Sequence, residues 1–447
     1  MDLVLEGGTI VTMDPERRVL REPLLVSNGT ITSVGQEVLE PRVSGNGAGA
    51  RIVRHLDCEG KVIIPGLVQS HVHLCQTLLR GYADGLELMD WLRDRVWPFE
   101  GRHTFETMRS SVLLGIAELI RGGTTACLDM GSVRHTDAVF EAAAEAGYRL
   151  TCGKSMMDEQ DVVPVPLRES TEDSLAESDA LAGRWHGACG GRLRYAYAPR
   201  FVLSCTERLL REVADRASGG SLVHTHASEN RNELAAVRRT LGKDNVAYLH
   251  ELGISGSNVA LAHCIWLGED EKRLLAETGT HVLHCPSSNL KLGSGIAEIP
   301  ELMKEGARVS LGADGAPCNN NLDMWTEMRL AALVHLPRVG AGGLTAEQVF
   351  EMATLGGARA LGIEDEIGSI EVGKRADLAI LNLESPHSIP PGEDVYSRLV
   401  YSGRSADVES VLIDGELVLE QGVLKTLDEN SVLSGGKKNA AGGPSTR

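Results

Sequence analysis

Paired histidines end two of the short apolar runs in this chain. His71 and His73 close KVIIPGLVQSHVH, and His224 and His226 lie in GSLVHTHASE. Residues i and i+2 of a β-strand point to the same side, so His71 and His73 can bind one metal ion together. His226 and Asp314 can complete a site that leaves one position open for water, which is typical of catalytic metal sites. These nitrogen and oxygen ligands suit Zn²⁺, and Fe²⁺ accepts them too.

Other titratable residues end neighbouring apolar runs. His263 ends NVALAHC, His284 ends THVLHC, and Glu229 follows His226 by three residues. Singly, each has an ordinary structural explanation: a hydrogen-bonded core histidine, or an exposed carboxylate at the start of a helix. Their joint placement at strand ends favours a metal-dependent active site.

A repeating pattern of strands and helices must position these residues. From residue 65 to 365, eight short apolar runs alternate with helix-like segments such as 110–121 and 136–147. Eight such units in roughly 300 residues predict an α/β fold of the (β/α)₈ TIM-barrel type, with its chemistry at the carboxyl ends of the strands. A doubly wound open sheet is the alternative, although the chain shows no Gly-rich dinucleotide turn.

Both ends of the chain carry strand and hairpin signals. Asn28-Gly29 and Asp414-Gly415 each separate alternating apolar residues, as in two-residue hairpin turns. We therefore predict a small β-sandwich domain composed of residues 1–64 and 366–433, and a catalytic barrel of residues 65–365. The low-complexity residues 434–447 are predicted to be disordered.

Composition limits the partners and the compartment. The net charge of −18 opposes attraction to nucleic acid or an anionic membrane. The sequence contains no apolar stretch of the length that a membrane helix needs and no basic signal-peptide start. Its nine cysteines form no CxxC pair and are predicted to be reduced thiols. We expect a cytoplasmic protein that binds a small molecule, and a homo-oligomer is compatible with these features.

Longer motifs resemble the amidohydrolase superfamily, in its deaminase and chlorohydrolase branch. They are PGLVQSHVH, HASE from His226, AHC around His263, SSNLKLGSG from Ser287, GADGAPCNNNLDM from Gly312 and ARALGIEDEIGSIEVGKRADLAIL. The resemblance covers nearly the whole chain and implies the same barrel with a small β-domain. Because no Lys at a strand end supplies a bridging carbamate, it implies one metal ion per chain.

The resemblance also assigns roles to the candidate residues. The implied metal ligands are His71, His73, His226 and Asp314. The metal lowers the pKa of water, and His263 and Asp314 orient and deprotonate that water. Glu229 relays a proton to a ring nitrogen, which makes the attacked carbon electrophilic and lets ammonia leave.

The segment after the first strand indicates the substrate. Residues 78–100 resemble deaminases of S-adenosylhomocysteine, methylthioadenosine and 5′-deoxyadenosine, in which the last Glu of the segment, here Glu100, accepts hydrogen bonds from the ribose. Trp91 and Trp97 are candidates for apolar walls around a base or 5′ substituent, or for helix packing. These features predict attack at C6 of a 5′-substituted adenosine.

Two other features are similar to guanine deaminase. Ala198-Pro199-Arg200-Phe201 and the later HASENRNE depart from the adenosine type, and Gln76 falls where guanine deaminases hold their purine. The planar donors of Arg200 suit a purine, or else form a salt bridge at the barrel rim. A guanine or aminotriazine deaminase is therefore the alternative enzyme. A metal-dependent small-molecule binding protein is the non-enzyme alternative, although binding alone needs no proton relay.

Overall fold

Two sheets of parallel strands form the centre of the protein. The computed structural model describes residues 2–35 and 53–440. One sheet has the order β12-β10-β9-β8-β18 and the other has the order β14-β15-β16-β17. Their bounds are β8 (Leu67–His73), β9 (Thr124–Met130), β10 (Arg149–Gly153), β12 (Leu193–Tyr195), β14 (Val223–Ala227), β15 (Val259–His263), β16 (His281–His284), β17 (Arg308–Leu311) and β18 (Asp314–Gly315).

The two sheets approach each other at both of their edges. An isolated parallel bridge pairs Tyr197 with Val223, on the side of β12 and β14. On the side of β17 and β8, the Ser70 hydroxyl donates to the Leu311 carbonyl oxygen at 2.8 Å. The strands therefore follow one another in chain order, as the sequence predicts, but they pair as two sheets rather than as one continuous ladder.

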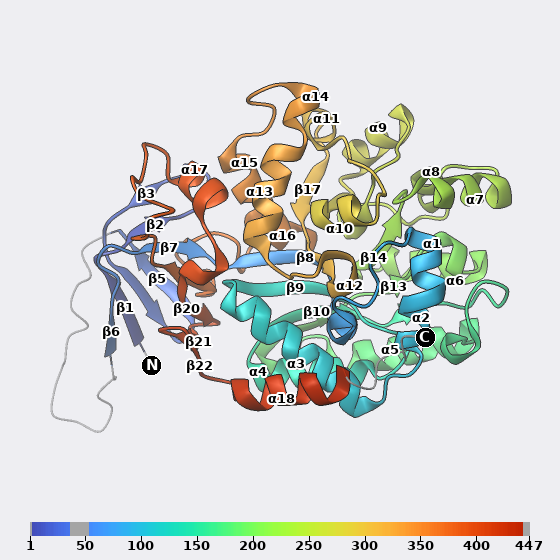
Figure 1. The fold of residues 1–447 in the computed structure, drawn as a ribbon, viewed down its shortest axis with the longest axis horizontal. Helices are drawn as coiled ribbons and strands as arrows, with labels where there is room; N and C mark the ends of the chain where they lie inside the picture. Colours follow the sequence, from blue (N-terminus) through green and yellow to red (C-terminus); the bar gives the residue numbers. More distant parts are fainter. Residues whose placement is uncertain (1, 36–52, 441–447) are drawn as a thin grey trace.

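Helices surround these strands (Figure 1). The longer ones are α3 (Phe105–Arg121), α4 (Thr136–Ala146), α5 (Thr171–Trp185), α6 (Glu207–Ser218), α7 (Arg231–Leu241), α9 (Glu269–Thr278) and α13 (Met324–Val334). Shorter helices are α8 (Asn245–Glu251), α10 (Pro286–Lys291), α11 (Ile299–Lys304), α12 (Ala316–Asn319), α14 (Leu336–Val339), α15 (Ala346–Met352), α16 (Leu355–Ala360) and α17 (Val395–Ser397). None of the helices within the described ranges is long and apolar enough to cross a membrane.

Strands from both chain ends share one sheet beside the parallel strands. This sheet has the order β22-β21-β20-β19-β7-β2-β3. It contains β2 (Thr9–Val11), β3 (Val19–Leu20) and β7 (Val62–Pro65) together with β19 (Leu378–Leu381), β20 (Val408–Ile413), β21 (Glu416–Glu420) and β22 (Val423–Leu424). A four-stranded sheet, β5-β4-β1-β6, is formed by β1 (Asp2–Glu6), β4 (Leu24–Ser27), β5 (Thr30–Val34) and β6 (Val53–Asp57).

The two predicted hairpins are confirmed. Asn28-Gly29 joins β4 to β5, and Asp414-Gly415 joins β20 to β21. All four residues have positive φ, from 50° to 77°, as a two-residue hairpin turn requires.

A buried ion pair connects β10 to the seven-stranded sheet. Arg149, at the first residue of β10, donates from Nε and Nη2 to the Asp377 carboxylate at 2.7 and 2.9 Å. Asp377 lies just before β19 and is 3% exposed, as is Arg149. The same carboxylate accepts the backbone N–H of Asp414. This pair therefore ties residues from distant parts of the chain together.

The predicted disorder of residues 434–447 is wrong for their first half. Residues 434–440 belong to α18 (Glu429–Ala440), which lies along α3 (Figure 1). Arg121 of α3 donates twice to the Glu429 carboxylate, at 2.7 and 2.6 Å, and Val432 is buried. Tertiary packing thus stabilises a helix that composition alone does not favour. Residues 441–447, like 36–52 of the predicted β-domain, lie outside the described residues.

A separate hydrophobic cluster lies over the carboxyl ends of the parallel strands. Nine of its buried residues come from segment 78–99: Leu78, Leu79, Ala83, Leu88, Trp91, Leu92, Val96, Trp97 and Phe99. The others follow strands elsewhere in the chain: Val133, Met157, Val163, Leu167, Phe201, Leu292 and Cys318. We call these sixteen residues the cap cluster. Segment 78–99 includes the one-turn helix α1 (Leu88–Trp91), and α2 (Trp97–Glu100) follows.

Candidate active site

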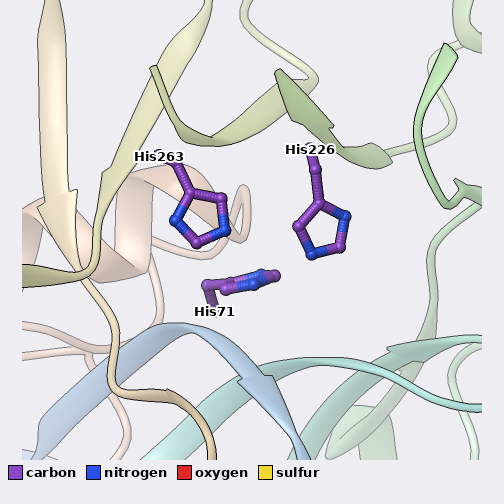
Figure 2. A group of neighbouring side chains, drawn as sticks. All are labelled: His71, His226 and His263. Carbon is purple, nitrogen blue, oxygen red and sulfur yellow. The ribbon is translucent and has the colours of Figure 1, made fainter. Parts of the chain in front are cut away.

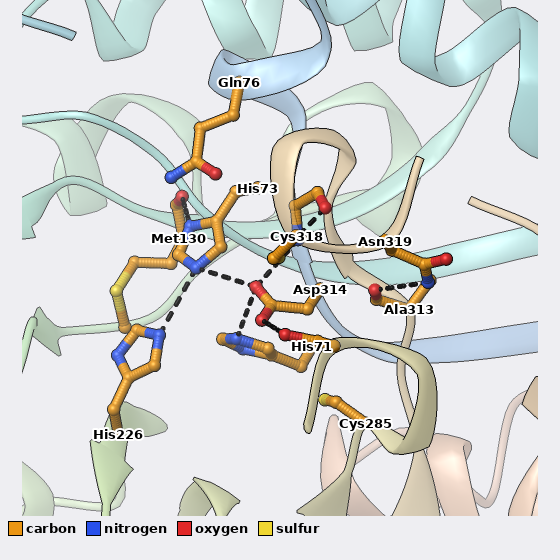
Figure 3. A network of polar contacts seen from close by, with 12 residues as sticks. His71, His73, Gln76, Met130, His226, Cys285, Ala313, Asp314, Cys318 and Asn319 are labelled. Carbon is orange, nitrogen blue, oxygen red and sulfur yellow. Dashed lines mark hydrogen bonds and ion pairs between the residues drawn. The ribbon is translucent and has the colours of Figure 1, made fainter. Parts of the chain in front are cut away.

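The four predicted metal ligands converge on one point. The Nε2 atoms of His71 and His73 each lie 3.4 Å from Oδ1 of Asp314. Nε2 of His73 lies 3.3 Å from Nε2 of His226 (Figure 3). The ring of His263 faces the same point as His71 and His226 (Figure 2). Four strand ends thus contribute to one cluster.

Strand register and one glycine explain how Asp314 reaches the histidines. In the pairing of β18 with β8, Asp314 is opposite Val72, between the two histidines. Gly312 lets this segment pass close to β8, because a Cβ there would lie 2.6 Å from the carbonyl oxygen of His71. Asp314 and His263 have positive φ values of 62° and 73°, which are uncommon outside glycine and cluster at functional sites.

Hydrogen bonds fix the tautomers of the ligand histidines. Nδ1 of His73 donates to the Met130 carbonyl oxygen at 2.8 Å, and Nδ1 of His226 donates to the Arg200 carbonyl oxygen at 2.6 Å. Both Nε2 atoms therefore carry lone pairs, although they are only 3.3 Å apart. Nδ1 of His71 contacts Nε2 of His224 at 2.7 Å, and Nε2 of His71 is buried without a hydrogen-bond partner among the described residues. The unprotonated Nε2 atoms of His73 and His226, together with the unpartnered Nε2 of His71, fit a metal cation.

Burial sets the charge of the ligands. Burial lowers the pKa of His71 and His226, and it lowers the pKa of His73 to about 3. Neutral imidazole is the form that binds metals. Burial acts to raise the pKa of Asp314, but its close approach to His71, His73 and His263 outweighs this and holds the pKa well below its usual value. The site therefore offers neutral nitrogens and one carboxylate.

Glu229 and His263 flank the ligand cluster. Nε2 of His263 lies 3.5 Å from Oε2 of Glu229 and 3.9 Å from Oδ2 of Asp314, and its Nδ1 contacts Oδ1 of Asn289 at 2.9 Å. Burial, together with the charges of Asp314 and Glu233, raises the pKa of Glu229 well above its usual value. Burial and the neighbouring carboxylates therefore favour the protonated form of Glu229.

Three predicted substrate-binding residues form a buried polar group. Arg200 donates from Nη1 and Nη2 to the two oxygens of Glu100, at 2.7 and 3.1 Å. Gln76 donates to Oε1 of Glu100 at 2.8 Å. Arg200 is 3% exposed and Glu100 is 1% exposed. Arg200 therefore forms a salt bridge, as the alternative role predicts, and this pair is buried.

A cavity of about 410 Å³, part of it open to solvent, adjoins these groups. It is lined by His73, Leu88, Trp91, Leu92, Arg200, Phe201, His226, Glu229, Glu233, His263 and Asp314. Trp97, which we singled out as an apolar wall, is buried in the cap cluster and does not line the cavity. Trp91, the other tryptophan considered, does.

Sequence reasoning assigned no role to several residues that support the site. His224 contacts His71, Ser288 donates to Oδ2 of Asp314 at 2.6 Å, and Asn289 orients His263. The sequence contains signals that could have identified these residues. His224 precedes His226 by two positions, and Ser288 and Asn289 lie in the motif SSNLKLGSG. His284 instead lies with its ring 5.4 Å from that of His335, outside the metal-ligand group.

Residues 62–418 match the model of the amidohydrolase family. The chain belongs to this family. This amidohydrolase is 35% identical to a 5′-deoxyadenosine deaminase of Methanosarcina mazei over 98% of both chains. It is 40% identical to a 5-methylthioadenosine/S-adenosylhomocysteine deaminase of Moorella thermoacetica, over 84% of this chain and 86% of the relative.

Solved structures agree with the family assignment. An adenosine deaminase from Xanthomonas campestris with bound zinc has a TM-score of 0.90 and 33% identity over 98% of both chains. Guanine deaminase of E. coli has a TM-score of 0.83 and 29% identity, over 94% of this chain and 99% of that one. The amidohydrolase thus has an α/β fold of the TIM-barrel class, and the zinc in its structural relative supports a metal cofactor. The predictions of the family and of a hydrolytic deaminase are confirmed.

Proposed function

We propose that this amidohydrolase removes the 6-amino group of 5′-substituted adenosines, leaving a 6-oxo group and releasing ammonia. The substrate class is that of the named relatives, which are similar to this chain over most of its length. One observation carries the proposal: the buried carboxyl of Glu229 lines the same cavity as His73, His226 and Asp314 and lies beside His263. Binding alone needs no such proton carrier.

The ligand set supports a single divalent ion, which we propose to be Zn²⁺, with Fe²⁺ compatible with the same donors. His71, His73, His226 and Asp314 would hold it. When bound, the ion supplies Lewis-acid activation of a water molecule.

Glu229 and Asp314 then transfer protons during the reaction. Glu229 donates its proton to N1 of the adenine ring, so that C6 becomes electrophilic. Asp314, ionised in this site, accepts a proton from the attacking water, and His263, whose Nε2 lies 3.9 Å from Oδ2 of Asp314, orients that water. As the C6–N bond breaks, the proton held by Asp314 passes to the leaving amine, the proton on N1 stays on the ring, and the proton of the new 6-hydroxyl returns to Glu229. Water and adenosine thus yield ammonia and the 6-oxo product.

On the ribose side, Glu100 is held by Arg200 and Gln76. We propose that this group binds the sugar hydroxyls and that Arg200 offers its remaining N–H donors to the substrate, since it also lines the cavity. Trp97 does not line the cavity, and it contributes to the substrate site through its packing in the cap cluster.

A guanine or aminotriazine deaminase is the second candidate. The presence of Arg200 in the cavity wall and of Gln76 behind it favours this reading. Free guanine has no ribose, so Glu100→Ala should reduce kcat/KM for a nucleoside far more than for a free base if the first proposal holds.

We further propose the domain division given by the sequence, with residues 65–365 as a (β/α)₈ barrel and residues 1–64 and 366–433 as a composite β-sandwich. The seven-stranded sheet drawn from both chain ends supports it. All nine cysteines lie in the described part of the chain and are free thiols, which supports a cytoplasmic location. The proposed partner is a small purine nucleoside.

Replacement of a metal ligand tests the proposal. His71→Ala should remove bound metal and ammonia release together, as measured by elemental analysis and a coupled ammonia assay. His250→Ala, an exposed histidine that contacts Ser255, is the matched control and should keep both. Full turnover by His71→Ala would refute the site, and two tightly bound ions per chain would refute the single-ion assignment.

A further inference from the structure

Two short helices hold Asp314 and the residue before it. The Ser288 hydroxyl of α10 donates to Oδ2 of Asp314 at 2.6 Å. The Asn319 amide of α12 donates to the Ala313 carbonyl oxygen at 2.7 Å (Figure 3), and the Ala313 N–H donates to Oε1 of Gln69 at 2.8 Å. Asp314 has a positive φ of 62°, a conformation that persists only where the surrounding structure fixes it. These contacts therefore fix the backbone that carries the carboxylate.

The helix α10 also orients His263. Nδ1 of His263 donates to Oδ1 of Asn289 at 2.9 Å, and Asn289 is the next residue after Ser288 in α10. A shift of α10 would therefore move the contacts of Asp314 and of His263 together. The spacing between Nε2 of His263 and Oδ2 of Asp314, 3.9 Å, depends on where this helix lies.

A buried carboxylate of α13 connects α10 to α12. Oε2 of Glu327 accepts the backbone N–H of Ser287 in α10 at 3.1 Å, and its Oε1 accepts from the Asn319 amide of α12 at 2.8 Å. Glu327 is 0% exposed. The same Asn319 nitrogen donates to Ala313, so Glu327 reaches both segments that hold Asp314. Neither Glu327 nor its partners Ser287 and Asn319 line the cavity.

The chemistry of these contacts requires a carboxylate. Both groups that face the oxygens of Glu327 are N–H donors, and only an ionised carboxylate offers an acceptor to each of them. A glutamine has the same shape, but its amide nitrogen would face one of the donors. Burial raises the pKa of Glu327 to about 7, although the hydrogen bonds from Ser287 and Asn319 act to lower it. The ionised form is therefore favoured in mildly alkaline buffer.

We propose that Glu327 is a positioning residue for Asp314 and His263, and that it acts through α10 and α12. The inference rests on the proposed function, in which Asp314 accepts a proton from the attacking water and His263 orients that water. Glu327 keeps the carboxylate and the imidazole at a fixed spacing. Loss of one of its hydrogen bonds should therefore slow the chemical step and leave substrate binding unchanged.

Glu327→Gln tests the inference, and Glu271→Gln is the matched control. Glu271 is a 3% exposed carboxylate that accepts the backbone N–H groups of Val246 and Gly268 at 2.9 and 3.0 Å. Its hydrogen bonds thus hold the starts of α8 and α9 instead of α10 and α12. Both variants should lose stability in urea.

Only Glu327→Gln should lose turnover. In mildly alkaline buffer, we expect kcat for 5′-deoxyadenosine to fall by about 10- to 100-fold, the usual effect of losing an outer partner of a metal site, with KM unchanged. An unchanged kcat in the folded, zinc-loaded Glu327→Gln protein would overturn the inference. An equal loss of kcat in Glu271→Gln would overturn it too, because a general loss of packing would then explain both.

Zinc retention gives a measurement that does not depend on turnover. Each zinc-loaded protein is mixed with EDTA, and the loss of zinc is followed over time. Because Asp314 is a proposed ligand, Glu327→Gln should lose zinc faster than Glu271→Gln, and equal rates would overturn the inference. Absence of ammonia release by the zinc-loaded unmodified protein would overturn the proposed function instead, and the zinc measurement would still test Glu327.

Asn319→Ala takes the place of Glu327→Gln if that variant does not fold. It removes the donor that links Glu327 to the Ala313 carbonyl oxygen and leaves the buried carboxylate with the N–H of Ser287. We expect the same fall in kcat with unchanged KM, and the same faster loss of zinc. An unchanged kcat in folded, zinc-loaded Asn319→Ala would overturn the inference.

Discussion

The buried pair of Arg200 and Glu100 makes a strong prediction about stability. Arg200→Met removes both guanidinium donors, and the only nearby positive charge, from the Glu100 carboxylate, which is 1% exposed and keeps only the Gln76 amide as a side-chain donor among the described residues. Removing one partner of a buried pair leaves an uncompensated charge, which costs about 3 to 5 kcal/mol of unfolding free energy. Glu100→Gln leaves Arg200 in the same position and should cost a similar amount.

The double variant should be much more stable than the two single variants imply. Arg200→Met with Glu100→Gln removes both charges, and Gln76 can still donate to the new amide oxygen. Replacing both ions of a buried pair is often close to neutral, so we expect a coupling energy of at least about 2 kcal/mol. Urea unfolding followed by circular dichroism measures this coupling energy when it is applied to the metal-loaded unmodified protein, the two single variants and the double variant. Effects that add to within about 0.5 kcal/mol would refute the reasoning.

Three further predictions concern other parts of the molecule. Glu229→Gln should keep the metal and lose turnover, because the amide preserves the shape of the side chain but carries no acidic proton. Measurement of metal content together with kcat checks this, and a retained kcat would contradict it. Burial raises the pKa of Asp129 from 3.8 to about 7, so its contribution to stability should be present at low pH and be lost as pH rises through that window. That loss is at most about 4 kcal/mol. It should be absent from Asp129→Asn, so the difference in unfolding free energy between this variant and the unmodified protein should change with pH by the same amount. Arg149→Ala leaves the buried Asp377 carboxylate without its guanidinium partner and should cost about 3 to 5 kcal/mol of unfolding free energy. The folded fraction of this variant should keep its kcat/KM.

The convergence of the proposed metal ligands could be predicted because their spacing reflects strand geometry. His71 and His73 lie two positions apart on β8, so both point to the same side of the strand. The register of β18 places Asp314 opposite Val72, between these two histidines. The hairpins at Asn28-Gly29 and Asp414-Gly415 could be predicted for a similar reason, since a local backbone conformation determines those residues.

Features that depend on tertiary packing could not be predicted in this way. Trp91 and Trp97 lie six residues apart, and only the packing of the cap cluster decides that the first lines the cavity. Arg200 is suited to a purine by its chemistry, but its pairing with Glu100 joins residues a hundred positions apart. The helix α18 is stabilised by contacts with α3, and these contacts could not be predicted from its low-complexity sequence.

Ammonia release from the purified, metal-loaded protein tests the central claim most directly. The protein is incubated separately with 5′-deoxyadenosine, 5′-methylthioadenosine and guanine, and both ammonia and the 6-oxo product are measured. We predict turnover of the two nucleosides, lost on removal of the metal and restored by adding Zn²⁺. Turnover of guanine alone, or no ammonia from either nucleoside with the metal fully loaded, would contradict the account.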